Sequence, residues 1–316
     1  MIVLFKKRKF SDYFSDTIDF FKTTGKHYFK NYFIIIGGFL IALVVLIYFI
    51  ATTYLEVLFA SFNNQTANAN FTLDYLSENF VLYAAVLVVF VLLAIILSII
   101  NITYPVLYLQ LIEKNNRVDF STKAIISAMK ANIGRMLVFF LGMLFVIFPL
   151  ALVIFGLTFL LVFIVIGVPL LFIIVPAFLS WIALSYHEYI IKRVGFFTAL
   201  NSGFEMLKQQ FWTIVGTTIL MLFAVQMLQG IVTLIPYIIG FVSLFSSISD
   251  DVSDPNAIQT GASILFVIIM TLSVLISYIF NNFMIINQGL MYYSLREENE
   301  NNSINTEIDA IGTDFE

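Results

Sequence analysis

The sequence predicts an all-α, polytopic integral membrane protein with six transmembrane helices arranged as three hairpins. Three observations support this fold class. The 316 residues are 60% hydrophobic and only 11% charged, and the mean hydropathy is +0.97. A soluble core of this length cannot bury so much apolar surface, whereas a bilayer can solvate it. The apolar residues also fall into long uncharged stretches, and the basic residues lie only at particular ends of these stretches.

The spans follow from the length of the uncharged stretches, because a helix needs roughly 20 apolar residues to cross a hydrocarbon core. Five stretches are long enough, and the third is long enough for two crossings. Gly156, or the pair Gly167 and Pro169, marks the turn between those two, and Pro149 and Pro176 are expected to kink the helices themselves. The predicted spans lie at about 33–54, 80–104, 136–158, 163–186, 211–238 and 262–290, within one membrane domain of residues 33–290.

The basic residues test this arrangement. Six spans leave four segments on one side of the membrane, and these contain seven, five, three and one Lys or Arg, which are all sixteen in the chain. The four segments are 1–32, 105–135, 187–210 and 291–316. The loops of the other side, near 55–79 and 239–261, contain acidic residues and no basic residue. The positive-inside rule therefore predicts that both termini are cytoplasmic.

The N-terminal segment, residues 1–32, is predicted to form a basic amphipathic helix in the membrane interface. Aromatic and aliphatic residues recur there at helical spacing, at Phe10, Tyr13, Phe14, Ile18 and Phe21. Basic residues near the bilayer attract anionic phospholipids. The candidates for such contacts are Lys6, Lys7, Arg8, Lys9, Lys22, Lys26 and Lys30. The helix is either a lipid- or partner-sensing element or an anchor that orients the first span, and we favour the anchor.

A similar arrangement recurs ahead of the third and fifth spans. The junctions "KNYFIIIGG" (30–38), "KANIGRMLVFFLG" (130–142) and "KQQFWTIVG" (208–216) each pass from Lys through polar residues into an apolar run with Gly. An amphipathic pattern precedes each of the three. The chain is thus predicted to contain three units, each a cytoplasmic interfacial helix followed by a membrane hairpin.

The stretch "HEYIIKRVGFFTALNSGFEMLKQQFWTIVG", residues 187–216, resembles a motif of the six-helix membrane domain attached to some bacterial glycerophosphodiester phosphodiesterases and of its stand-alone relatives. The resemblance lies in Ala199 and Ser202, in Leu207 and Lys208, and in the pair Phe211–Trp212. It implies a six-helix bacterial membrane domain. It implies no catalysis, because the soluble phosphodiesterase domain is absent, and most stand-alone relatives have no assigned function.

The predicted spans contain little chemistry. No Asp, Glu, Lys, Arg or His lies inside them, and the chain has no cysteine. His27 and His187 lie at the membrane boundaries, where His187 and Glu188 amount to half a metal site at most. Ser180 has no catalytic base beside it. We therefore expect no catalytic residue, no metal ligand and no cofactor, and a protein that is not an enzyme.

Amides are the main polar groups of the last two spans. Gln226 and Gln229 are one turn apart on span five, and Asn281 and Asn282 lie on span six, followed by Asn287 and Gln288. Such side chains either form hydrogen bonds between helices or line a polar pathway. We favour packing.

The C-terminal segment, residues 291–316, contains seven acidic residues and one basic residue. This composition is typical of disordered tails. It is either a docking peptide for a partner or a solubilising tail, and we favour the latter.

These features predict a non-enzymatic protein of the bacterial inner membrane, an accessory or scaffold subunit of a membrane assembly. The alternative is a transporter or channel for lipids or small molecules that uses the amides of spans five and six. The expected partners are the bilayer, anionic phospholipids and other membrane proteins. A pI near 5.2 gives no reason to expect nucleic acid.

Overall fold

The structure is a computed structural model of the chain, and it describes most but not all of the residues. The described backbone comprises residues 3–63, 77, 80–163, 165–250 and 255–300. Side chains are described within these ranges except in 56–63, 240–241, 243–250 and 255–263.

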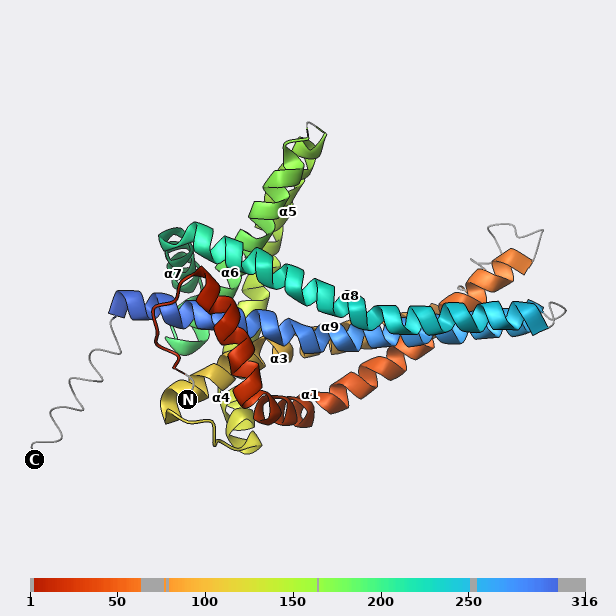
Figure 1. Ribbon diagram of the computed structural model, residues 1–316, viewed down its shortest axis with the longest axis horizontal. Helices are drawn as coiled ribbons and strands as arrows, with labels where there is room; N and C mark the ends of the chain where they lie inside the picture. Colours follow the sequence, from red (N-terminus) through yellow and green to blue (C-terminus); the bar gives the residue numbers. More distant parts are fainter. Residues whose placement is uncertain (1–2, 64–76, 78–79, 164, 251–254, 301–316) are drawn as a thin grey trace, which may run out of the picture. The chain divides into compact units, whose positions relative to one another are not determined.

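The described residues are helical apart from short connections, and they contain no strand. Six helical stretches among them are long and apolar enough to cross a membrane, which confirms the predicted number of spans. Figure 1 shows the helices in chain order. They are α1 (Phe10–Asn63), α3 (Phe80–Asn115), α4 (Thr122–Gly142), the π-helix η1 (Met143–Ile147), α5 (Phe148–Val162), α6 (Gly167–Ile191), α7 (Phe196–Gln209), α8 (Phe211–Asp250) and α9 (Pro255–Glu300).

The chain divides into two compact units. Unit 1 comprises Met1–Ile35, Asn101–Val225 and Asn281–Glu316, and therefore contains α4 to α7 entirely. Unit 2 comprises Ile36–Ile100 and Gln226–Phe280. All sixteen Lys and Arg residues belong to unit 1 and none to unit 2. A division based on contacts thus coincides with the partition of basic residues in the sequence.

The N-terminal helix and the first span form one helix. α1 continues through the predicted boundary at residue 33 without a break. Its buried face in unit 1 is formed by Tyr13, Thr17, Phe20, Thr24 and Tyr28. Of the face expected to lie among the acyl chains, Phe10 is 45% exposed and Phe14, Ile18 and Phe21 are half-buried, whereas Tyr13 is buried against protein. The position of this helix in the membrane interface stays a prediction. Threonines on the buried face bond their hydroxyls to backbone oxygens of the same helix, as Thr17 does with Tyr13 at 2.6 Å.

The third and fourth spans are separated at residues 163–166, between α5 and α6. This agrees with the alternative that placed the turn at Gly167 and Pro169, whereas Gly156 lies inside α5. Gly167 is required by close approach, because a Cβ there would lie 2.6 Å from the Thr158 carbonyl oxygen. Pro149 is the second residue of α5, which follows η1 directly. Because proline has no N–H to donate, it favours the wider π pattern, in which the Phe148 N–H bonds to the Met143 oxygen.

The C-terminal part of α9 is the centre of unit 1. Every residue from Met284 to Glu297 is buried, so this part of the helix has neighbours on all sides. The prediction of disorder is therefore wrong for Met291–Glu300, which are helical. The acidic composition was misleading because the charges of this segment are paired within unit 1. Residues 301–316 of the predicted tail lie outside the described residues.

α7 packs on α6 through small residues. Ala199 and Gly203 are buried, and a Cβ on Gly203 would lie 2.7 Å from the Ser185 backbone nitrogen. The Trp181 indole N–H donates to the Leu200 oxygen at 2.8 Å. A break at Gln210 separates α7 from α8, so the amphipathic helix ahead of the fifth span is a separate element.

Candidate functional site

Buried amides of α9 form hydrogen bonds to other helices of unit 1. The Tyr28 hydroxyl on α1 donates to the Asn282 side-chain oxygen at 2.6 Å, and both side chains are fully buried. The Asn287 amide donates to the Tyr13 backbone oxygen at 3.0 Å and to the Thr17 hydroxyl at 2.9 Å. These bonds join α1 to α9 at two levels.

A second group of polar side chains joins three helices. The Gln288 amide on α9 donates to the Thr218 hydroxyl on α8 at 2.8 Å and to the Ser180 hydroxyl on α6 at 3.3 Å. Ser180 and Thr218 are themselves 2.8 Å apart. All three residues are buried. Ser180 is therefore part of a packing network, which gives the serine a structural role.

Charged and aromatic residues surround the end of α9. Arg296 forms an ion pair with Glu113 of α3 at 3.0 Å, and the Tyr293 hydroxyl donates to the other Glu113 oxygen at 2.7 Å. The Tyr292 hydroxyl donates to Glu188 of α6 at 2.7 Å. We call Glu113, Glu188, Tyr292, Tyr293 and Arg296 the α9 clasp. Each carboxylate of the clasp thus accepts a hydrogen bond from α9.

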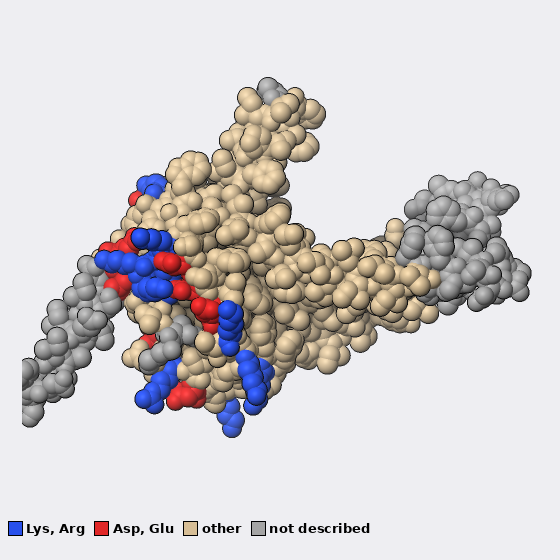
Figure 2. Space-filling model, viewed as in Figure 1, with Lys and Arg blue, Asp and Glu red and all other residues tan. Residues whose placement is uncertain are grey.

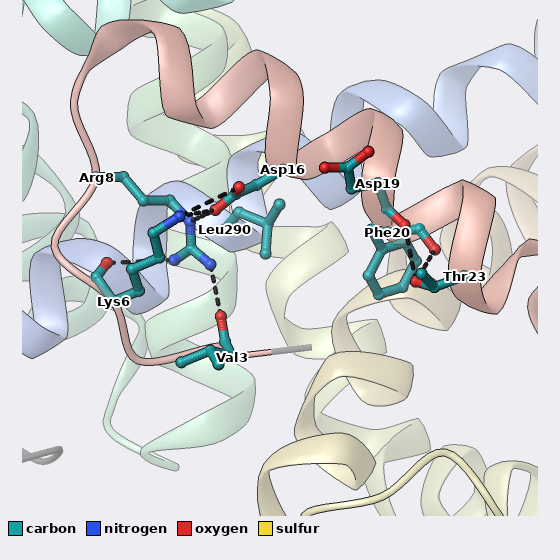
Figure 3. A pocket seen from close by; sticks show the side chains of 8 residues that line it. All are labelled: Val3, Lys6, Arg8, Asp16, Asp19, Phe20, Thr23 and Leu290. Carbon is teal, nitrogen blue, oxygen red and sulfur yellow. Dashed lines mark hydrogen bonds and ion pairs between the residues drawn. The ribbon is translucent and has the colours of Figure 1, made fainter. Parts of the chain in front are cut away.

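The segment before α1 packs against the clasp. Phe5 lies edge-on to Tyr293 at 5.3 Å, and the Arg8 backbone N–H donates to the Ser294 hydroxyl at 2.9 Å. The Arg8 side chain, 1% exposed, pairs with Asp16 at 2.8 Å and donates to the Val3 backbone oxygen (Figure 3). It also donates to the Leu4 backbone oxygen. Burial lowers the pKa of the Arg8 guanidinium, and the hydrogen bond and charge of Asp16 oppose this effect. Arg8 thereby joins residues 3 and 4 of the N-terminal segment to Asp16 in the first turns of α1.

A pocket of about 360 Å³ lies between this segment, α1 and α9. Its lining, shown in Figure 3, consists of Val3, Lys6, Arg8, Asp16, Asp19, Phe20, Thr23 and Leu290. Lys6 and Arg8 both pair with Asp16. The lining contains two cations and two carboxylates, Asp16 and Asp19, so its formal charges sum to zero and the pocket presents no excess charge on which to base a ligand.

Six of the seven residues predicted to contact anionic lipids are exposed, and Arg8 is not. Lys22, Lys26 and Lys30 follow one another at intervals of four along α1 and so lie on one face of that helix. Lys6 pairs with Asp16, and Lys22 with Asp19 at 3.3 Å. The structure does not support a lipid contact for Arg8, since its hydrogen bonds are made to protein groups.

The other predicted amides differ from Asn282. Gln226 is exposed and Gln229 half-buried, both in unit 2, and Asn281 is half-buried in unit 1. Among the described residues, no side-chain hydrogen bond involves these three. The structure therefore brings Asn282 into a packing network and leaves Gln226 and Gln229 outside it.

The described surface of the spans is largely apolar. Large hydrophobic side chains exposed on it include Val81 at 81%, Phe163 at 79% and Trp212 at 71%. Figure 2 shows, on the face in view, charged residues grouped over unit 1 beside large uncharged areas. Apolar surface of this extent is stable where lipid or another apolar surface covers it.

His187 is buried, with its Nδ1 2.7 Å from the Ala183 oxygen, and its ring stacks on Tyr292. His27 lies between the Tyr108 hydroxyl at 2.8 Å and the Phe120 oxygen at 3.0 Å. Within the described part of the chain, no group of three or more His, Asp or Glu side chains is placed to hold a metal ion.

Comparison of the chain with protein-family models, with curated proteins and with solved structures finds no match. The resemblance of residues 187–216 to the phosphodiesterase-associated membrane domain stays a prediction.

The α9 clasp was missed by sequence reasoning. Glu113 and Arg296 are 183 residues apart, and each lies just beyond a span, where charged residues are common. One signal in the sequence points to it, the run "MYYSLREE" (291–298) after the sixth span. In this run the two tyrosines, Met291 and Leu295 continue the apolar character of the span beyond its predicted end at residue 290.

Proposed function

We propose that this chain is a non-enzymatic, multi-pass protein of the bacterial inner membrane that serves as an accessory or scaffold subunit of a membrane assembly. The observation that carries the proposal is the use of buried polar groups in unit 1. Asn282, Asn287 and Gln288 are bonded to the three neighbouring helices α1, α6 and α8, as expected for a rigid framework that presents apolar helix surfaces to lipid and partners.

The proposed orientation has both termini in the cytoplasm. The partition of all basic residues into unit 1 supports it through the positive-inside rule. In this orientation the exposed Lys22, Lys26 and Lys30 stripe, which directly precedes the first span, lies within reach of anionic headgroups of the cytoplasmic leaflet.

One observation favours the alternative of a lipid or small-molecule transporter. Gln226 and Gln229 lie in a span and, among described residues, have no side-chain hydrogen bond. A pathway lined by these amides predicts that Gln226→Ala and Gln229→Ala abolish flux in proteoliposomes while the protein stays folded. A scaffold predicts that both variants keep the same partners as the unmodified chain.

The test of the scaffold proposal is purification of the full chain in a mild detergent after cross-linking in intact cells, followed by mass spectrometry of the recovered proteins. The expected result is one or more different membrane proteins in a fixed ratio to this chain. The variant Asn282→Ala disrupts the framework and should lose those partners. The matched control is Glu205→Ala, a change on the exposed face of α7, which should keep them. Recovery of this chain alone overturns the proposal.

The orientation has its own test, because the sequence has no cysteine. Lys26→Cys in unit 1 and Ser77→Cys in unit 2 each introduce the only thiol of the protein at an exposed position. In intact spheroplasts, a thiol reagent that cannot cross the membrane should label Ser77→Cys and leave Lys26→Cys unlabelled until the membrane is opened. The reverse pattern refutes the orientation.

A further inference from the structure

The exposed amide of Gln226 is in an unusual place for a membrane protein. The span of α8 comprises Phe211–Ile239, and Gln226 is 15 residues from its start and 13 from its end. It therefore lies near the middle of the hydrocarbon layer. An amide without a hydrogen-bond partner is strongly unfavourable there, because lipid tails supply neither donors nor acceptors.

The surroundings of Gln226 show which side of α8 is open. Within unit 2, Pro236 is buried and Gln229 is half-buried, so the packed side of the helix passes through these positions. Gln226 and Tyr237 lie on another side, where Tyr237 is 55% exposed. Gly230 has no atom within 4 Å of the place where a Cβ would be. This side of α8 therefore has room for a neighbour.

The open side has the spacing of a helix-packing seam. Gln226, Gly230, Thr233 and Tyr237 follow one another at intervals of four, three and four residues, the pattern by which two helices cross at a small left-handed angle. Gly230 permits close approach of a second backbone. The Thr233 hydroxyl is already bonded to the Gln229 backbone oxygen at 2.8 Å. Tyr237 lies two residues from the end of the span at Ile239, where its hydroxyl can reach the polar interface, so Gln226 is the polar group of the seam that needs a partner in the hydrocarbon layer.

We propose that the α8 seam, formed by Gln226, Gly230, Thr233 and Tyr237, joins two copies of this chain as a parallel pair of helices, with the two Gln226 amides bonded to each other. A second copy is the partner that fits, because a carboxamide carries both donors and an acceptor and is complementary to itself. Copies inserted with the same orientation bring the same helices together in parallel about a two-fold axis along the membrane normal. Each Gln226 then faces its equivalent, and a buried polar residue in a seam sets the register of the pair.

The seam is tested by disulfide formation in native membranes, using the full chain and its lack of cysteine. Single-cysteine variants at Gly230 and Tyr237, which keep the Gln226 amide, should give an oxidised dimer with copper phenanthroline. Leu228 and Ile235, exposed at 46% and 56% on the opposite side of the same helix, are the matched controls and should stay monomeric. Equal cross-linking on both sides, none at the seam, or a product containing a different protein overturns the proposal.

The amide pair is tested by the dissociation constant of the dimer in lipid bilayers, measured by fluorescence energy transfer at increasing lipid dilution. Gln226→Leu should raise this constant by about tenfold, whereas Gln226→Asn, which keeps the carboxamide, should change it by less than about threefold. Both variants are expected to fold, since the position is exposed. An unchanged constant in Gln226→Leu refutes the amide pair.

Self-association through this seam is independent of the partners in the proposed function, and the two experiments fail separately. Recovery of the chain as a dimer without other proteins overturns the scaffold role and leaves the seam intact. Recovery of other membrane proteins with a chain that is monomeric at every lipid dilution overturns the seam and leaves the scaffold role intact.

Discussion

The two units of this protein differ in whether their polar side chains are buried and hydrogen-bonded or exposed. Unit 1 contains every Lys and Arg of the chain and pairs its buried amides and carboxylates across helices. Unit 2 contains no basic residue, and Gln226 is exposed on it. A described apolar cluster of unit 2 consists of Ala51, Leu55 and Val267.

The difference shows how a membrane protein obtains a defined structure where the hydrophobic effect between helices is weak. Lipid tails solvate an apolar side chain about as well as another helix does, so specific packing must come from close contact and hydrogen bonds. Unit 1 has both, in the α9 clasp and in the small residues between α6 and α7. Substitutions in unit 1 should therefore be costly, and matched substitutions in unit 2 should not.

The largest effect is expected at the α9 clasp. Glu113→Ala removes one of the two carboxylates that pair with Arg296, whose side chain is 8% exposed. It should lower the free energy of unfolding by about 3 kcal/mol, because the Tyr293 hydroxyl loses its acceptor and the Arg296 guanidinium keeps only the pair with Glu300. The measurement is unfolding in mixed micelles. Glu205→Ala, which breaks the exposed pair with Lys208, is the control and should cost less than about 0.5 kcal/mol. Equal losses would show that the clasp is no more than a surface ion pair.

The next effect compares glycines in the two units. Gly203→Ala should cost about 2 kcal/mol, because its Cβ meets the Ser185 backbone and backbone atoms cannot turn aside as a side chain can. Gly230→Ala meets no atom within 4 Å and should leave stability equal or raise it by about 0.5 kcal/mol through helix propensity. Thermal unfolding in one detergent measures both. A loss at Gly230 as large as at Gly203 contradicts the contrast between the units.

Amides should separate the units by a smaller amount. Asn282→Ala leaves the buried Tyr28 hydroxyl without its acceptor and should cost about 1–2 kcal/mol. Combining it with Tyr28→Phe should recover part of that loss, since the unpaired hydroxyl is then removed. Gln226→Ala should cost nothing in the monomer. If the Asn282 variant is as stable as the unmodified chain, packing is not the role of that amide.

The smallest effect on stability is expected at the exposed lysines of α1. Replacing Lys22, Lys26 and Lys30 together by Gln should change the free energy of unfolding by less than about 0.5 kcal/mol. The affinity of the detergent-solubilised chain for a fluorescent anionic phospholipid should weaken by about 1 kcal/mol for each charge removed. The triple Arg variant keeps the charge and should bind as the unmodified chain does. Equal binding by the Gln and Arg variants would remove lipid contact as the role of the stripe.

Much of the fold could be predicted from the sequence because the bilayer imposes a length and a polarity on each crossing. The six spans follow from this, and so does the turn beside Gly167 and Pro169. Of the two turns that the sequence left open, the one at Gly156 lies inside α5, and the disorder predicted for residues 291–300 is wrong. At both positions the local sequence pattern permits two structures, and contacts with a neighbouring element select one.

The candidate site shows the same limit. Asn282 was recognised as an amide that packs or lines a pathway, but the sequence does not contain the position of its partner Tyr28, 254 residues away. Arg8 was grouped with the exposed lysines because its neighbours in the chain are lysines. Only the folded chain shows that Asp16 and two backbone oxygens enclose its guanidinium.

The sequence by itself determined that this protein is helical, that six of its segments can cross a membrane, and that its cations are absent from the loops near 55–79 and 239–261. These properties depend on the transfer of residues between water and lipid, which is a property of each segment alone. Only the tertiary structure decided which polar groups are satisfied and which are left open. That outcome depends on distances between helices far apart in the chain, and it separates the bonded Asn282 from the open Gln226.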